Sequence, residues 1–154
     1  LGKQLPTSTL QAICSTLIDT PFIILGGPDM QDLGNELANK FSNITSLCGK
    51  VSLSNTAYVL GKASLAIGGD TGAMHIATAV GTPLISVWGC TRPSLGLASW
   101  NPHPDSIILE PQGRGTRPCS RHGAKCRYKK FGKDLCINHV DPQRIIRAAK
   151  KLLK

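Results

Sequence analysis

Apolar-rich runs alternate with segments of helical hydrophobic period along the first part of the chain. The runs, each four or five residues long and each expected to form a buried strand, are 22–25, 44–47, 64–67 and 83–87. The segments around them predict a first helix with Ser8 or Thr7 as its N-cap and further helices near 29–41, 53–60 and 71–80. Strands that alternate with helices at this spacing predict βαβ units and one parallel sheet covered on both faces.

The pattern changes beyond Trp88. Residues 89–104 are rich in Gly, Pro and Ser and predict a long loop, and 106–109 predict a last strand. Residues 111–139 have no hydrophobic period. Such a long stretch is uncommon inside a compact domain, so we expect it to be functional, tied down or disordered.

A C-terminal helix begins at Asp141 and Pro142, as N-cap and first residue. Its expected apolar stripe is Ile145, Ile146, Ala149 and either Leu152 or Leu153. With 154 residues and 41% hydrophobic content, the chain suits a single domain. We expect one domain over 1–154, made of a core (1–111), a basic cysteine-containing loop segment (112–140) and a C-terminal helix (141–154).

Charge is distributed unevenly between these parts. Residues 1–111 hold five basic and seven acidic residues, whereas the last 43 residues hold thirteen basic and two acidic ones. The formal net charge of +9 therefore comes entirely from the C-terminal end. Such asymmetry fits an anionic partner, which could be nucleic acid, a phosphorylated substrate or a membrane face; the alternative is a merely solvated surface.

The candidate chemistry is concentrated between Ala66 and His75, in the sequence Ala-Ile-Gly-Gly-Asp-Thr-Gly-Ala-Met-His. An apolar strand leads there through a glycine-rich turn into a helix. Glycines let the backbone approach a ligand closely, and the free N–H groups and dipole of a helix start favour negative charge. The stretch therefore predicts an anion-binding site with two titratable neighbours, Asp70 and His75.

No run of about 18 apolar residues occurs, and Leu1-Gly2-Lys3 has no signal-peptide character. We therefore expect a cytoplasmic protein. The chain starts without Met and with Lys3-Gln4-Leu5-Pro6 leading directly into a helix, which suggests a piece of something larger.

Two motifs in register carry a resemblance to a known family. They are Gly69-Asp70-Thr71-Gly72-x-x-His75-x-Ala77 and Gly81-Thr82-Pro83-Leu84-Ile85-x-Val87-Trp88-Gly89-x-Thr91-x-Pro93, with Lys3-x-x-Pro6 and Gly26-Gly27-Pro28-Asp29 upstream. Together they resemble the signature of glycosyltransferase family 9, the heptosyltransferases. The resemblance implies an α/β fold, a Rossmann-like three-layer sandwich with a mostly parallel sheet, as the C-terminal half of a GT-B enzyme.

The resemblance further implies that this half binds the nucleotide sugar, such as ADP-heptose, for transfer to a lipopolysaccharide-type acceptor. Thr71, Gly72 and the N–H groups of Ala73 and Met74 would hold the diphosphate. Lys3 matches the family lysine that reaches the phosphates.

Two further acids and a histidine are implied to complete the donor site. His75 lies one helical turn beyond Thr71 and would donate to the phosphate; the alternative is a packed structural histidine. Asp70 would contact the sugar hydroxyls, or else cap the helix. The family places an acid on the nucleoside ribose near Asp29 and Asp32, of which we select Asp29, although each could simply favour a helix start.

The loop after the 83–87 strand is also implied to lie near the donor. Thr91 and Pro93 would shape this loop over the donor. Trp88 fits a position in the hydrophobic core at least as well as a position in the loop.

The cysteines allow several interpretations. Cys119, Cys126 and Cys136, with His139 nearby and His122 interleaved, offer enough ligands for tetrahedral zinc, although the spacing is not that of a Cys-x-x-Cys knuckle. We expect free, partly buried thiols, with zinc and a disulfide as alternatives. The other three, Cys14, Cys48 and Cys90, are expected as small core residues.

The implied reaction is inverting glycosyl transfer without metal or other cofactor, in which a general base on the N-terminal domain deprotonates the acceptor. That base is outside this sequence, so we expect weak nucleotide binding without turnover. The basic end would hold a phosphorylated lipid oligosaccharide at the inner face of the cytoplasmic membrane. Alternatives are a nucleotide-binding module of another GT-B enzyme and a basic Cys/His nucleic-acid-binding module; we expect no nucleic acid.

Overall fold

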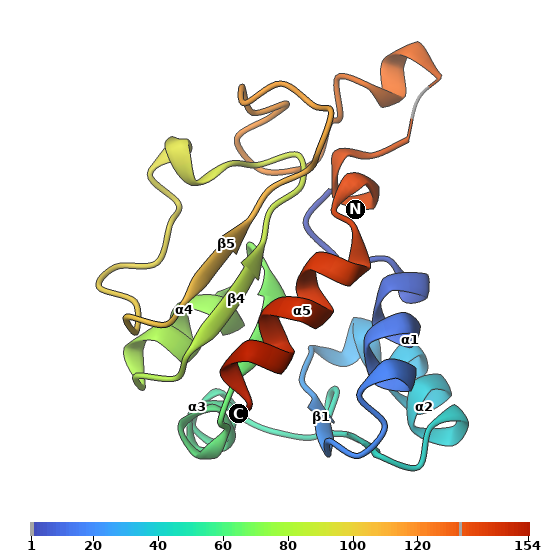
Figure 1. Cartoon of the computed structure of the whole chain (residues 1–154), viewed down its shortest axis with the longest axis vertical. Coiled ribbons are helices and arrows are strands. Elements are labelled where there is room, and N and C mark those ends of the chain that lie inside the picture. Colours follow the sequence, from blue (N-terminus) through green and yellow to red (C-terminus); the bar gives the residue numbers. More distant parts are fainter. Residues whose placement is uncertain (1, 133) are drawn as a thin grey trace.

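The computed structural model describes residues 2–132 and 134–154 (Figure 1). Its helices are α1 (Thr7–Thr16), α2 (Gln31–Lys40), α3 (Leu53–Lys62), α4 (Gly72–Ala79) and α5 (Pro142–Leu152). Its strands are β1 (Phe22–Ile24), β2 (Ile44–Ser46), β3 (Ala66–Gly69), β4 (Leu84–Val87) and β5 (Ile107–Leu109). Short 3₁₀ turns are η1 (Pro28–Met30), η2 (Pro93–Leu95), η3 (Lys129–Phe131) and η4 (Cys136–His139).

Each strand pair is parallel, as predicted, but the strands form two hydrogen-bonded sheets instead of one. β1 pairs with β2, and β3, β4 and β5 pair in that order. Phe22 of β1 and Ile67 of β3 nevertheless pack against the same buried cluster. Side-chain packing therefore joins the two sheets where no backbone hydrogen-bond ladder does.

Helices cover the larger sheet on opposite sides. α5 packs against β4, β5 and α1, while α4 packs against β3 and β4 and is covered by α3; Figure 1 shows α5 crossing in front of the strands with α4 behind them. Ile85, Ile145 and Ile146 are almost fully buried on the α5 side. The predicted βαβ architecture and apolar stripe of the last helix are confirmed.

The helix starts were predicted with mixed success. Asp141 caps α5 as expected, accepting a hydrogen bond from the Gln143 N–H at 2.9 Å. Thr7 and Ser8 do not cap α1, because the helix begins one residue earlier and Pro6 occupies the N-cap. Proline fixes the backbone at the helix start without any side-chain cap.

No helix within the described parts of the chain is long and apolar enough to span a bilayer.

Candidate functional site

An ion pair between Lys3 and Asp70 lies at the carboxyl end of β3. Asp70 directly follows the strand and is only 5% exposed, and its Oδ2 lies 2.7 Å from Lys3 Nζ. The lysine side chain is 30% exposed. A buried carboxylate requires a compensating cation, and the Lys3 ammonium provides one while its side chain still reaches the surface.

The N-terminal backbone reaches this position by passing close to two glycines. A Cβ on Gly69 would overlap the Lys3 carbonyl oxygen, and one on Gly89 would overlap the Gly2 carbonyl oxygen. The Gly2 oxygen also accepts a hydrogen bond from the Cys90 N–H at 3.0 Å. These two motif glycines therefore make room for the chain itself, which the sequence analysis did not anticipate.

The start of α4 is open beside the ion pair. Thr71 is its N-cap residue, is exposed, and makes no side-chain cap. The Met74 N–H donates to the Thr71 carbonyl at 3.1 Å, so the expectation that it faces a ligand is wrong. A Cβ on Gly72 would meet no atom within 4 Å. The N–H groups of Gly72 and Ala73 remain for a ligand, since the first helical N–H groups have no partner within the helix.

The structure rejects the structural alternatives for Asp70 and His75. Asp70 is not the helix cap, because Thr71 occupies that position and Asp70 instead pairs with Lys3. His75 is exposed on α4 and is not packed between helix and sheet. Their contacts with phosphate and sugar remain predictions.

The turn after β1 carries the two candidate ribose acids. Asp29 lies in η1 and Asp32 in the first turn of α2, and both are exposed. The Asp29 carboxylate folds over its own turn, since a Cβ on Gly27 would lie 2.7 Å from its Oδ1. The same N-terminal segment that carries Lys3 reaches this turn, where Gln4 Nε2 donates to Met30 Sδ at 3.2 Å.

The segment after β4 is buried more deeply than expected. Trp88 is 1% exposed and donates from Nε1 to Ser86 Oγ at 3.1 Å, which confirms its core position. Thr91 is fully buried, so its side chain is not part of a surface loop, while Pro93 begins η2.

Arg92 is a buried residue that sequence reasoning missed. It is 2% exposed, its Nε lies 3.3 Å from Glu110 Oε1, and its guanidinium donates to the carbonyls of Gly89, Thr91 and Gly115. An arginine in a Gly- and Pro-rich loop usually points to solvent. No local sequence signal distinguishes this one, because its partners lie up to 23 residues away.

Comparison with known proteins decides the family. The profile of glycosyltransferase family 9 (heptosyltransferase) matches residues 3–124. The chain belongs to glycosyltransferase family 9. It is 31% identical over 135 residues to lipopolysaccharide heptosyltransferase 3 of Escherichia coli K12, covering 85% of this chain and 36% of that protein.

Solved structures agree with this assignment. A family 9 glycosyltransferase from Veillonella parvula superposes with a TM-score of 0.79 at 19% identity, over 98% of this chain and 42% of that chain. The E. coli heptosyltransferase WaaC with ADP gives 0.65 at 25% identity, over 84% of this chain and 39% of that chain. The GT-B-related, Rossmann-like fold is thereby confirmed. The chain spans well under half the length of these family 9 proteins.

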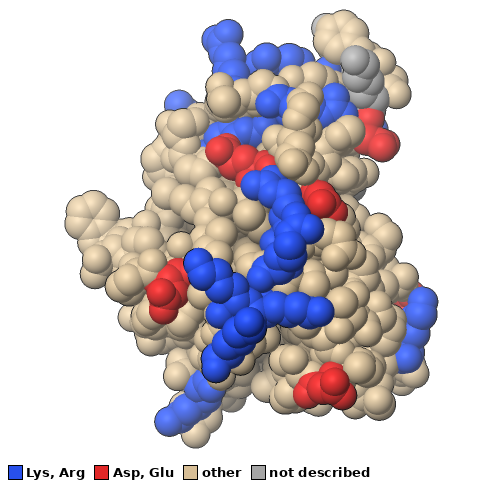
Figure 2. Space-filling model, viewed as in Figure 1, with Lys and Arg blue, Asp and Glu red and all other residues tan. Residues whose placement is uncertain are grey.

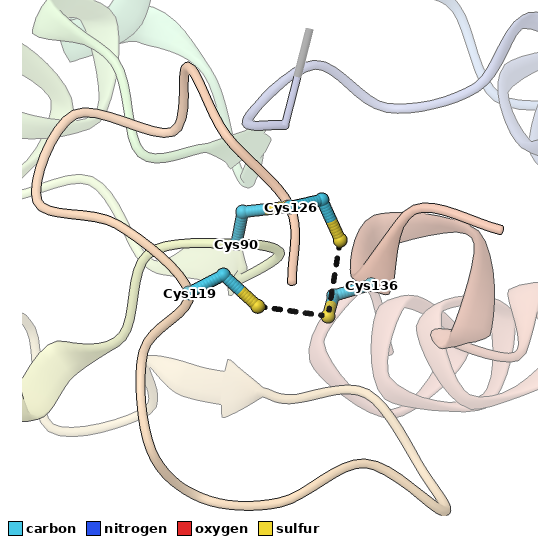
Figure 3. A group of neighbouring side chains, drawn as sticks. All are labelled: Cys90, Cys119, Cys126 and Cys136. Atoms are coloured by element: carbon cyan, nitrogen blue, oxygen red, sulfur yellow. Dashed lines mark hydrogen bonds between the residues drawn. The ribbon is translucent and has the colours of Figure 1, made fainter. Parts of the chain in front are cut away.

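Four cysteines gather beside the family 9 motif (Figure 3). The Sγ atoms of Cys90, Cys119, Cys126 and Cys136 all lie within 4.8 Å of one another, and all six cysteines are free. Cys14 and Cys48 are buried as predicted. Cys90 was expected as an ordinary core residue, but it lies three residues after β4 and packs with Cys126 and Cys136 of the loop segment.

His139 does not join this cluster, although the alternative zinc site considered in the sequence analysis included it. Its Nε2 instead contacts the guanidinium of Arg114, at the end of η4. His122 is exposed. The sequence could identify three of the four clustered cysteines, but the fourth lies 29 residues before Cys119 and becomes a neighbour only through the fold.

The clustered thiols have strongly different acidities. Burial raises the pKa of Cys90 to about 11 and raises the pKa of Cys136 beyond the ordinary thiol range, and neighbouring thiols add to both effects. Burial also opposes ionisation of Cys126, but hydrogen bonds from the backbone at Lys129 and Cys136 outweigh it and lower the pKa to about 6. One thiolate thus forms readily, and its charge opposes ionisation of its neighbours.

Proposed function

We propose that this chain is the donor-binding half of a heptosyltransferase, which binds a nucleoside-diphosphate sugar such as ADP-heptose for transfer to a lipopolysaccharide-type acceptor. The candidate donor-binding residues are Lys3, Asp29, Asp70, Thr71, Gly72, Ala73 and His75. Support comes from membership of family 9 and from similarity to an enzyme solved with ADP.

The observation that carries the proposal is the Lys3–Asp70 ion pair beside the open start of α4. A diphosphate placed near a bare carboxylate would be repelled. The lysine ammonium has three donors, so it can hold Asp70 and still donate to a phosphate oxygen. Helix N–H groups and the exposed Thr71 hydroxyl add further donors.

Asp70 itself is proposed to accept hydrogen bonds from the donor sugar, because a carboxylate is an acceptor-only group suited to hydroxyls. His75 is exposed one helical turn beyond Thr71 and would donate to the diphosphate. Stabilising the charge that develops on the departing diphosphate is the main electrostatic task of this half. No metal or other cofactor is needed for these contacts.

The general base of the transfer is proposed to lie on another domain. In support, this chain corresponds to only 42% of the length of a family 9 structure. We therefore expect nucleotide binding by the 154-residue chain without turnover.

A basic face is proposed to meet the acceptor at the cytoplasmic side of the membrane. Figure 2 shows lysines and arginines gathered along the exposed side of α5. The exposed members on this helix and just after it are Arg147, Lys150, Lys151 and Lys154. Each basic residue near an anionic membrane contributes about 1 kcal/mol of attraction, so this face would hold phosphorylated lipid.

Isothermal titration calorimetry with ADP, UDP and GDP tests the donor site. We expect one nucleotide to bind preferentially, and His75→Ala to weaken that binding by about tenfold, the equivalent of one charge-assisted hydrogen bond. His103→Ala, which alters a histidine in the loop before β5, is the matched control and should change the affinity by less than about twofold.

Asp70→Asn distinguishes sugar from phosphate recognition. The isosteric amide removes negative charge, so ADP should bind at least as tightly, whereas the extra affinity for ADP-heptose over ADP should fall. Failure of the folded chain to bind any of the three nucleotides would reject the proposed function. Tight, salt-sensitive binding to RNA in place of nucleotide would favour the nucleic-acid alternative.

A further inference from the structure

The four-cysteine cluster has no role in the donor contacts proposed above. Cys90 follows β4, Cys119 and Cys126 lie in the loop segment, and Cys136 begins η4. In Figure 3 the side chains converge from these separate stretches toward one small volume. Three of the four residues are buried and Cys119 is partly exposed.

The sulfur spacing matches one tetrahedral metal ion. Zinc–sulfur bonds of about 2.3 Å place tetrahedral ligand atoms about 3.8 Å apart. Cys136 Sγ lies 3.6 Å from Cys119 Sγ and 3.8 Å from Cys126 Sγ, and no pair in the group exceeds 4.8 Å. We propose that Cys90, Cys119, Cys126 and Cys136 bind a single structural zinc ion.

Other uses of four cysteines fit the geometry less well. A disulfide joins two sulfurs at about 2.05 Å, whereas Cys136 Sγ lies 3.6 Å from Cys119 Sγ and 3.8 Å from Cys126 Sγ, so each pair would have to move together, and one disulfide would leave two thiols unpaired. In an iron–sulfur cluster the ligand sulfurs bind different irons, which requires a wider arrangement than this one. A single ion satisfies all four sulfurs at once.

The surrounding charge suits a tetrathiolate site. Four thiolates and Zn²⁺ leave a net charge of −2, which needs cationic surroundings. From residue 112 to Cys126 the sequence holds four basic and no acidic residues. These are Arg114, Arg117, Arg121 and Lys125. Positive surroundings favour thiolate, so the site also offsets repulsion within this segment.

The loop segment has little else to fold around. Among its described residues from 112 to 135, only Gly123 and Cys126 are buried. The hydrophobic cluster here consists of Cys90, Cys126 and Cys136, with Cys119, Tyr128 and Leu135 packed against it. The sulfurs are therefore the centre of this small core, and metal binding would supply folding energy that apolar area does not.

The zinc site would also fix Lys3, an effect that rests on the proposed donor site. The Cys119 N–H donates to the Cys90 carbonyl at 2.8 Å, and the Cys90 N–H donates to Gly2. Gly123 packs on the Lys3 side chain, since a Cβ there would lie 2.8 Å from Lys3 Cγ. Loss of zinc should thus loosen Lys3 and weaken ADP binding.

Metal analysis of the unaltered chain, purified under reducing conditions, tests the proposal. Elemental analysis should give about one zinc per chain. Replacement by Co²⁺ should give the strong visible absorption and sulfur-to-cobalt charge transfer of a tetrahedral tetrathiolate site. Chelation should lower Tm by at least about 5 °C, because structural zinc contributes to folding.

Two variants and a control locate the ion. Cys119→Ser and Cys136→Ser should weaken zinc binding by more than about 100-fold, since even an outer-shell partner is worth about 10–100-fold. Cys48→Ala alters a buried cysteine outside the cluster and should keep its zinc. If the serine variants do not fold, the cobalt spectrum of the unaltered chain decides.

The proposal is overturned by folded chain that holds no zinc and gives no tetrathiolate cobalt spectrum. Stoichiometric iron with labile sulfide, or a chain mass lower by two hydrogens per disulfide with no metal bound, would overturn it equally. If the chain binds zinc but binds no nucleotide, the zinc site is supported and the proposed donor site is rejected.

Discussion

Residues 2–111 and the loop segment 112–140 are stabilised by different kinds of groups. In the former, apolar side chains such as Ile85 and Val87 are fully buried within regular strands. In the latter, sulfurs lie at the centre, and arginine side chains satisfy backbone carbonyls. The regular part of the chain therefore depends on buried apolar area, whereas the loop segment depends on a few contacts between residues that are distant in sequence.

The largest effect is expected in the apolar core. Ile145 of α5 is fully buried, so Ile145→Ala should lower the free energy of unfolding by about 3–4 kcal/mol. Urea denaturation followed by circular dichroism measures this. Ile18→Ala, at a position 47% exposed, is the control and should cost less than about 0.5 kcal/mol; equal losses in both variants would contradict the packing described.

Arg92→Met is expected to release the loop segment. The change leaves the carbonyls of Gly89 and Gly115 without their donor, which costs about 2–3 kcal/mol. Limited proteolysis should cut the loop segment faster than in Arg147→Met, which alters an exposed arginine. Unchanged proteolysis would mean that the buried guanidinium does not fasten this segment.

Two adjacent glycines are expected to respond differently to substitution by alanine, because only Gly69 packs against the N-terminal segment. Gly69→Ala should cost about 1–3 kcal/mol, because its Cβ would push against the Lys3 carbonyl, and should weaken ADP binding by displacing Lys3. Gly68→Ala meets no atom within 4 Å and should cost far less. Denaturation and calorimetry on the pair test this, and equal behaviour would contradict the proposed path of the N-terminal segment.

The smallest stability effect is expected at Gly72. A Cβ there meets nothing in the free chain, so Gly72→Ala should change the free energy of unfolding by no more than about 1 kcal/mol and could stabilise the helix. If a diphosphate approaches this backbone closely, the same change should weaken nucleotide binding by at least about fivefold. An unaltered nucleotide affinity would mean that the diphosphate does not bind at the start of α4.

The sequence was sufficient to predict the alternating strands and helices, because their apolar residues are local and periodic. It also predicted the Asp141 cap, which depends on neighbours two residues apart. It did not predict that β1 and β3 belong to separate hydrogen-bonded sheets. The side-chain pattern of a three-residue strand does not indicate which neighbouring strand it pairs with.

The candidate site was predicted in part. The motif placed Asp70, Thr71, Gly72 and His75 on one strand–turn–helix, which the structure bears out as an arrangement. The ion pair with Lys3, the burial of Arg92 and the addition of Cys90 to the sulfur cluster depend on contacts between distant residues. Such contacts follow from the folded topology and have no local signal.

The ADP affinity of Lys3→Met, compared with Lys62→Met, tests the central claim most directly. Lys3 pairs with Asp70 at the proposed phosphate position, whereas Lys62 ends α3 and lies over the Tyr58 ring. Calorimetry should give ADP binding that Lys3→Met weakens by at least about tenfold, since a charge-assisted contact is worth about 1.5–3 kcal/mol, and that Lys62→Met leaves within about twofold. Equal affinities for the two variants would contradict a phosphate contact at Lys3.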